Sequence, residues 1–183
     1  MTFRILRVRA MILVAAVLVG VISAQPVAQD RSAILAKELT SLLQERKLDS
    51  IAARHPAAAD QFVAALFFPG QLLVVWARTT APAILNEKLA RREFRDVYID
   101  LNSASIPESR VMISDSSADG LRPRREANQP FDTHDANGKT TRFDGNWRED
   151  KMSEADYMKI YTQADSAYVT ALEALLTELK KTS

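Results

Sequence analysis

The sequence predicts an α+β fold, in which a mostly antiparallel sheet or a small barrel of about six strands carries an inserted helix and N- and C-terminal helices. Short apolar or alternating runs are separated by turn-forming dipeptides, as in antiparallel hairpins. Longer segments repeat their apolar residues every three or four positions, as helices do. The segments expected as strands, in three hairpins, are 62–68, 72–78, 96–102, 110–114, 131–135 and 139–143.

The clearest hairpin signal is Pro69-Gly70, which separates the apolar runs 62–68 and 72–78. Proline presets φ and glycine accepts the positive φ of the next turn position, so the two runs are expected to pair. Both runs are apolar on nearly every residue, which predicts that both faces of these strands are covered. We expect this hairpin at the centre of the fold.

Two weaker hairpins complete the predicted sheet. Asn137-Gly138 favours a type I′ turn between 131–135 and 139–143. In 96–102, apolar residues alternate with Tyr98 and Asp100, the period-2 pattern of a half-buried strand, and a loop then leads to 110–114. The polar segment 115–130 is expected to be a long surface loop.

Three helices are predicted around the sheet. The first covers 30–47, continues or restarts through Ile51, and stops before Pro56, because a residue that precedes proline avoids the α region. The inserted helix opens at Pro82 and runs to Phe94. The last starts at Ser153, where Ser153 and Asp156 resemble a capping box.

The last helix carries a stripe of three tyrosines, Tyr157, Tyr161 and Tyr168, followed by leucines at the same spacing. The stripe could form a partner-binding face or the wall of a pocket. Aromatic residues at helical spacing are more often core, with their hydroxyl groups reaching its rim, and we expect that arrangement here.

The first 24 residues have the form of a secretory signal peptide: three arginines, no acidic residue, and an apolar run from Ala10 to Ala24. The run is short for a membrane-spanning helix, so we expect cleavage after Ala24 and a periplasmic or secreted protein; an uncleaved anchor is the alternative. The remainder, 25–183, is expected to form one globular domain, whose contact with a membrane is limited to the export step.

Composition excludes several functions. The chain has no cysteine, hence no disulfide, thiol nucleophile, thiolate metal site or lipid-modified cysteine. Three of its 24 basic residues lie in the signal segment, whereas all 23 acidic residues lie beyond it, so the mature chain is close to neutral and nothing predicts a nucleic-acid partner.

The stretch 78–89 offers polar residues at the junction of a strand and the inserted helix: Arg78, Thr79, Thr80, Asn86 and Lys88. The order strand, strand, helix, strand, strand over roughly 60–145 resembles the split β-barrel of flavin-binding, pyridoxamine-phosphate-oxidase-like domains. In that family the corresponding stretch holds the flavin phosphate, so the resemblance implies an FMN-like cofactor held by these five residues. The family's Ser-x-Lys is absent, and an ordinary capped helix start explains the same residues.

Other chemistries find little support. The two histidines, His55 and His134, are far apart, and a partial calcium-loop pattern over 133–144 lacks the acidic first residue and the final glutamate. No metal ligand is therefore assigned. No G-x-S-x-G motif or other catalytic set is present. We expect a non-enzymatic domain that binds a small molecule or a protein; a flavin-binding protein or oxidoreductase is the alternative.

Overall fold

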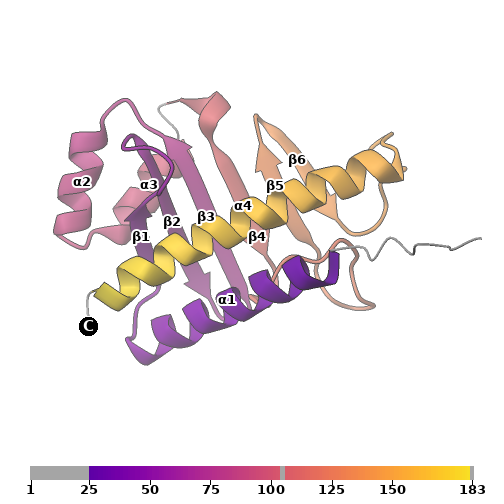
Figure 1. Cartoon of the computed structure of the whole chain (residues 1–183), viewed down its shortest axis with the longest axis horizontal. Helices are drawn as coiled ribbons and strands as arrows, with labels where there is room; N and C mark the ends of the chain where they lie inside the picture. Colours follow the sequence, from indigo (N-terminus) through magenta and orange to yellow (C-terminus); the bar gives the residue numbers. More distant parts are fainter. Residues whose placement is uncertain (1–24, 104–105, 182–183) are drawn as a thin grey trace, which may run out of the picture.

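The computed structural model describes residues 25–103 and 106–181 (Figure 1). Its sheet has six strands in the order β1-β2-β3-β4-β5-β6, and each strand pairs antiparallel with the next along the chain. The strands are β1 (Ser50–Arg54), β2 (Gln61–Phe68), β3 (Gln71–Arg78), β4 (Val111–Asp115), β5 (Asp132–Ala136) and β6 (Lys139–Phe143). The helices are α1 (Gln25–Glu45), α2 (Pro82–Ala90), α3 (Phe94–Ser103), α4 (Glu154–Lys181) and the short 3₁₀ helix η1 (Pro107–Ser109).

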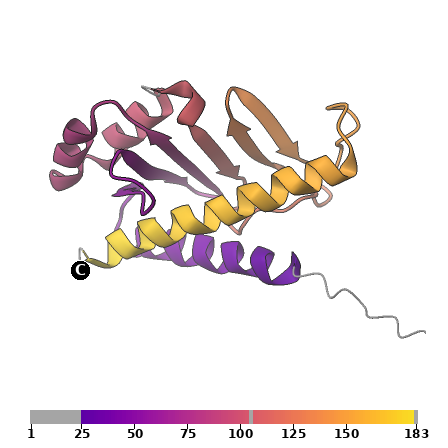
Figure 2. The ribbon, with the colours of Figure 1, turned by 45° about the horizontal axis from the view of Figure 1, so that its top comes forward.

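The helices form a layer on each face of the sheet, but the two layers differ in extent. On one face α4 crosses every strand, and α1 packs beside it (Figures 1 and 2). On the other face α3 packs against β1, β2 and β3, with α2 beside it. Within residues 25–103 and 106–181, no helix therefore lies over the second face of β4, β5 and β6.

The buried apolar residues form one cluster, which extends to both faces of the sheet where both helical layers are present. Phe62, Val74 and Val75, on the central strands β2 and β3, are fully buried. From the α1–α4 layer Leu39 and Leu172 are also fully buried, and from α3 Val97 is. The prediction that both faces of the central hairpin are covered is confirmed.

Several local predictions are confirmed. Gly70 has φ +78 in the two-residue β2–β3 turn, and Asn137 and Gly138 have φ +54 and +70 in the β5–β6 turn, as a type I′ turn requires. The Ser153 hydroxyl accepts a hydrogen bond from the backbone N–H of Asp156 at 3.1 Å, so it caps α4. Segment 116–131 contains no strand or α-helix, as expected of the long loop.

Two predicted elements are wrong. The segment 96–102 belongs to helix α3 and is not a strand: Phe94, Val97, Tyr98 and Leu101 form its buried stripe, whereas Ile99 is 53% exposed. Ile51 and Ala52 belong to strand β1, although the first helix was expected to continue there. The sheet still has six strands, because β1 replaces the strand expected at 96–102.

Three further predictions concern the inserted helix, the closure of the sheet and the N-terminal segment. The inserted helix ends at Ala90, four residues before the predicted end, and a turn at Arg92 with φ +60 separates it from α3, so two helices stand where a helix and a strand were expected. Within the described residues β1 and β6 each pair with a single strand, which leaves the sheet open instead of closed into a barrel. The predicted signal peptide, 1–24, lies outside the described residues. Among those described, no helix is both long and apolar enough to span a membrane.

Candidate functional site

A cleft of about 340 Å³ opens where β3 ends and α2 and α3 pack together. Its lining combines an apolar floor with a polar rim. The floor is Ala77, Ala81, Ile84, Leu85 and Leu101, and the rim is Arg78, Thr79, Asp100 and Ser103. Ile84 is 54% exposed, so much of this apolar side chain is accessible to a ligand in the cleft.

Local sequence explains why the chain opens a cleft here. Strand β3 ends at Arg78, and the Thr79 hydroxyl accepts a hydrogen bond from the N–H of Ala81 at 3.1 Å, which turns the chain sharply. Pro82 then starts α2 without a side-chain cap, as proline can at the first helical position. Helix α2 is thereby directed away from β3 and onto α3, and the space between them is the cleft.

The charged groups around the cleft are engaged in ion pairs. Nε of Arg78 lies 3.0 Å from Oδ2 of Asp60. Nζ of Lys88 donates to Oδ2 of Asp100 at 2.7 Å, and this hydrogen bond raises the pKa of Lys88. The lysine therefore stays positively charged at every ordinary pH, with its charge balanced by Asp100.

Of the five residues predicted to form the site, the structure places Arg78 and Thr79 in the cleft. Lys88 reaches the cleft margin through Asp100. Asn86 points elsewhere, because its side-chain oxygen accepts a hydrogen bond from Arg54. Thr80 is exposed and does not line the cleft. Sequence reasoning missed Asp100, Leu101 and Ser103, because 96–102 was assigned to a strand.

A second cleft of about 420 Å³ lies between the end of β1 and the C-terminal half of α4. It is lined by Ala53, Arg54, Pro56, Thr170, Glu173, Ala174, Thr177, Glu178 and Lys181. Its acidic groups are held by neighbours: Glu173 accepts from Arg31 at 2.8 Å, and Glu178 accepts from Lys181 at 3.4 Å. This cleft offers a solvated charged rim and fewer large apolar side chains than the first.

The tyrosine stripe on α4 is core, as predicted. Tyr157, Tyr161 and Tyr168 are 1%, 7% and 0% exposed. The hydroxyl groups of Tyr157 and Tyr161 donate to the backbone carbonyls of Pro123 and Leu121, at 2.6 and 3.0 Å. The hydroxyl of Tyr168 donates to a carboxylate oxygen of Asp115 at 3.0 Å. The stripe therefore fastens the loop 116–131 to α4.

Sequence reasoning also missed a pair of buried acids, Asp115 and Asp132, which are 0% and 7% exposed. Burial raises the pKa of both, and the neighbouring charge of Asp115 contributes to raising that of Asp132 to about 7. They are 17 positions apart, and only the pairing of β4 with β5 brings them together. The only sequence feature that could have indicated this pair is an aspartate at each end of a polar loop.

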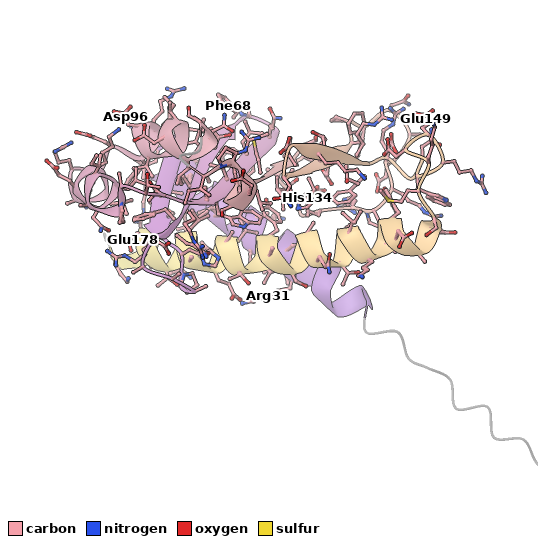
Figure 3. The ribbon with its side chains drawn as sticks, turned by 90° about the horizontal axis from the view of Figure 1, so that it is seen from above. Arg31, Phe68, Asp96, His134, Glu149 and Glu178 are labelled. Carbon is pink, nitrogen blue, oxygen red and sulfur yellow. The ribbon has the colours of Figure 1, made fainter. Side chains whose placement is uncertain are left out.

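The histidines occupy structural positions. His134 lies on the face of the sheet toward α4, where its ring stacks on Phe143 with centroids 6.5 Å apart, and burial lowers its pKa (Figure 3). Nδ1 of His55 accepts the N–H of Ala57 at 3.2 Å. Within residues 25–103 and 106–181, no three His, Asp or Glu side chains are grouped in a way that could hold a metal ion.

Comparison with known proteins gives no further guide to the site: no protein-family model matches the chain, and no curated protein or solved structure matches it significantly.

Proposed function

We propose that this is an exported, non-enzymatic binding domain whose cleft beside α2 and α3 takes a small molecule with an apolar body and a polar or anionic group. The cleft carries this proposal, because it combines an apolar floor with the exposed side chain of Ile84 and with the guanidinium of Arg78 at the rim. Small-molecule sites are typically concave and mostly apolar, with a few polar groups that set orientation.

The ion pairs at the rim favour binding over catalysis. Arg78 and Lys88 are each paired with an aspartate, which fixes the positions of both cations. The dianionic phosphate of FMN would have to displace Asp60 and Asp100 from these cations, whereas a polar or singly charged group could contact the rim with both ion pairs intact. The alternative, a flavin or anionic-cofactor protein, is for that reason less well supported.

The export part of the proposal rests on the arginines and the apolar run before Gln25. It is tested by producing the full chain in a Gram-negative host and measuring the intact mass of the protein from the periplasmic fraction. We expect the mass of a chain that begins at Gln25. A full-length chain in the membrane fraction would indicate the uncleaved anchor, and a full-length chain in the cytoplasm would contradict export.

The binding site is tested with anilinonaphthalene sulfonate, a fluorescent probe with an aromatic body and an anionic group. Ile84 and Ile99 form a matched pair, because they are 54% and 53% exposed and only Ile84 lines the cleft. We expect Ile84→Ser to weaken probe binding at least several-fold and Ile99→Ser to leave it unchanged. Equal effects of the two substitutions would show that the probe binds elsewhere.

The same preparations distinguish the two candidate functions. A thermal-shift titration with FMN and riboflavin tests the flavin alternative directly. We expect neither flavin to raise the melting temperature. A saturable shift with FMN that is lost in Arg78→Gln, with riboflavin inactive, would instead favour an anionic-cofactor site.

A further inference from the structure

Asp115 and Asp132 face each other across two neighbouring strands. Ser114 of β4 pairs with Thr133 of β5, so the next residues along, Asp115 at the end of β4 and Asp132 at the start of β5, project from the same face of the sheet. That face lies under α4, and both side chains are more than nine-tenths buried. Side chains that are directly opposite in an antiparallel pair are in contact range.

The two carboxylates bind the first part of the loop 116–131 through its backbone. Asp115 accepts hydrogen bonds from the N–H groups of Asp119 and Gly120, at 3.1 and 2.8 Å, and a weaker one from Ser117 at 3.4 Å. Asp132 accepts from the N–H groups of Ser116 and Arg122, at 2.8 and 2.9 Å. The pair thus fixes the conformation of 116–122.

The same part of the loop is seated against both helices of the α1–α4 layer. Gly120 lies so close to α1 that a Cβ atom there would be 2.5 Å from the backbone nitrogen of Ala33. Tyr161 and Tyr157 of α4 hold the following carbonyls of Leu121 and Pro123. A change that weakens the hydrogen bonds between the two carboxylates and the loop therefore also weakens the contact of the loop with α1 and α4.

Two neighbouring carboxylates in a buried site cannot both be ionised without a large cost. The hydrogen bonds decide which of them carries the negative charge. Asp115 accepts four, including one from the neutral Tyr168 hydroxyl, whereas Asp132 accepts two from backbone groups. Asp115 is therefore the better stabilised anion, and a single proton is held on Asp132; a pair of this kind titrates as one unit.

The charged and titratable groups that face Asp115 and Asp132 also disfavour a second negative charge on the pair. The loop contributes Asp119 and the guanidinium of Arg122, which bond to each other at 2.7 Å. Helix α4 contributes Tyr161, Tyr168 and the buried Asp165, whose own pKa is raised by burial and which is hydrogen-bonded to Ser32 of α1. The positive charge of Arg122 is thus largely balanced by Asp119, and the second charge on the pair has little compensation.

We propose that Asp115 and Asp132 share one proton, and that loss of this proton releases the loop 116–131 from α1 and α4, so that the loop is a pH-sensitive latch. The latch is held most tightly in acidic solution, loosens as the pH rises to about 7, and does not loosen further above that. This proposal is independent of the cleft beside α2, which lies on the other face of the sheet.

Amide hydrogen exchange measures the latch directly. Protection factors, corrected for the intrinsic pH dependence of exchange, are measured from pH 5.5 to 8.5 for the amides of Asp119, Gly120 and Arg122, with Val74 in the central sheet as reference. Because opening of the loop releases the proton, we expect the three loop amides to lose at least tenfold in protection between pH 5.5 and about 7, to change little above pH 7, and to stay less protected than Val74 at every pH. Protection factors for the loop that do not depend on pH would overturn the proposal.

Two variants assign the effect to the pair. Asp132→Asn removes the titrating proton but keeps only one of the two oxygens that accept from Ser116 and Arg122, so we expect loop protection at pH 5.5 to be lower than in the original protein and no longer to depend on pH. Glu126→Gln removes an exposed carboxylate from the same loop and should leave the pH dependence of the original protein. If Asp132→Asn retains that pH dependence, the proton is not on this pair.

A measurement on the unsubstituted protein keeps the test decisive if Asp132→Asn does not fold. The ¹³C chemical shifts of the aspartate carboxyl carbons are followed against pH by NMR. We expect one carboxyl of the pair to titrate near neutrality and the other well below it. Titration of both carboxyls below pH 5 would rule out the shared proton.

Discussion

The two ends of the sheet are stabilised in different ways. Strands β1, β2 and β3 are covered by helices on both faces (Figures 1 and 2). Most of their side chains are apolar. Strands β4, β5 and β6 are covered on one face by α4, and their other face carries polar side chains joined in pairs. Arg110 bonds to Asp135 at 3.3 Å, Thr140 to Asp135 at 3.0 Å, and Arg142 to Glu149 at 3.0 Å.

The two ends should therefore respond differently to pH. Burial of apolar area does not respond to pH, so the β1–β3 end should act as a constant scaffold. Buried carboxylates and tyrosine hydroxyls do respond, and in the described chain Asp115, Asp132 and Asp165 lie on β4, on β5 and on the α4 segment above them. The cleft is attached to the scaffold end and the latch to the polar end.

The comparison is tested most strongly by deleting one side chain at each end of the same face. Phe62 lies on the face covered by α3 and is 0% exposed, whereas Thr140 lies on the uncovered part and is exposed. We expect Phe62→Ala to lower the free energy of unfolding by about 3–5 kcal/mol, through lost burial and the cavity left behind. Thr140→Ala should change it by less than about 0.5 kcal/mol. Urea unfolding measures both, and comparable losses would show that the two ends do not differ.

The next largest effect is the pH dependence of stability. With its folded pKa raised to about 7, Asp132 keeps its proton in the folded state at pH values where the unfolded chain has lost it. The contribution of Asp132 to stability is therefore highest below about pH 4, falls as the pH rises to 7, and is level above that. Between pH 5 and 7 the expected loss is about 2–3 kcal/mol, since each pH unit contributes about 1.4 kcal/mol. Urea unfolding at fixed pH values checks the slope, and Asp132→Asn should flatten it.

A smaller effect separates two buried tyrosine hydroxyls. That of Tyr168 donates to the Asp115 carboxylate at 3.0 Å, whereas that of Tyr98, at the apolar end, lies 3.8 Å from the sulfur of Met112. Tyr168→Phe should cost about 1.5 kcal/mol, because a buried carboxylate loses one donor but keeps those from the backbone. Tyr98→Phe should cost well under 1 kcal/mol. Thermal unfolding measures both variants. Equal changes in melting temperature for Tyr168→Phe and Tyr98→Phe would show that the polar end does not depend more strongly on hydrogen bonds than the apolar end.

The same contrast explains which parts of the fold could be predicted from sequence. The central hairpin, the Asn137-Gly138 turn and α4 have local signals that agree with their final environment, and all three are confirmed. The apolar residues in and next to the segment 96–102 fit both a strand pattern and a helix pattern. Val97, Ile99 and Leu101 alternate as in a strand, but Phe94, Val97, Tyr98 and Leu101 also form a helical stripe, and packing of α3 against β1–β3 decides for the helix.

The candidate site was predictable only in its local part. Arg78 and Thr79 were identified because a strand meets a helix there, and the structure places both in the cleft. The opposite wall, with Asp100 and Ser103, depends on α3 and so could not be found once that segment was assigned to a strand. Asp115 and Asp132 were missed for a different reason: their contact depends on the register of two strands separated by a 16-residue loop, which no short-range pattern encodes.

The smallest expected change in the free energy of unfolding comes from the N-terminal caps of two helices, one at each end of the molecule. At the polar end, Ser153 caps α4 and its hydroxyl also donates to Asp156 at 2.6 Å; at the cleft, α2 begins after Ala81 with no side-chain cap. Ser153→Ala should lower the free energy of unfolding by about 1 kcal/mol, and Ala81→Ser should raise it by up to a similar amount. Thermal unfolding measures both. A loss of stability in Ala81→Ser would mean that the turn held by the Thr79 hydroxyl cannot accept a second hydroxyl, and that α2 is positioned by that turn and by its packing on α3 and not by a helix cap.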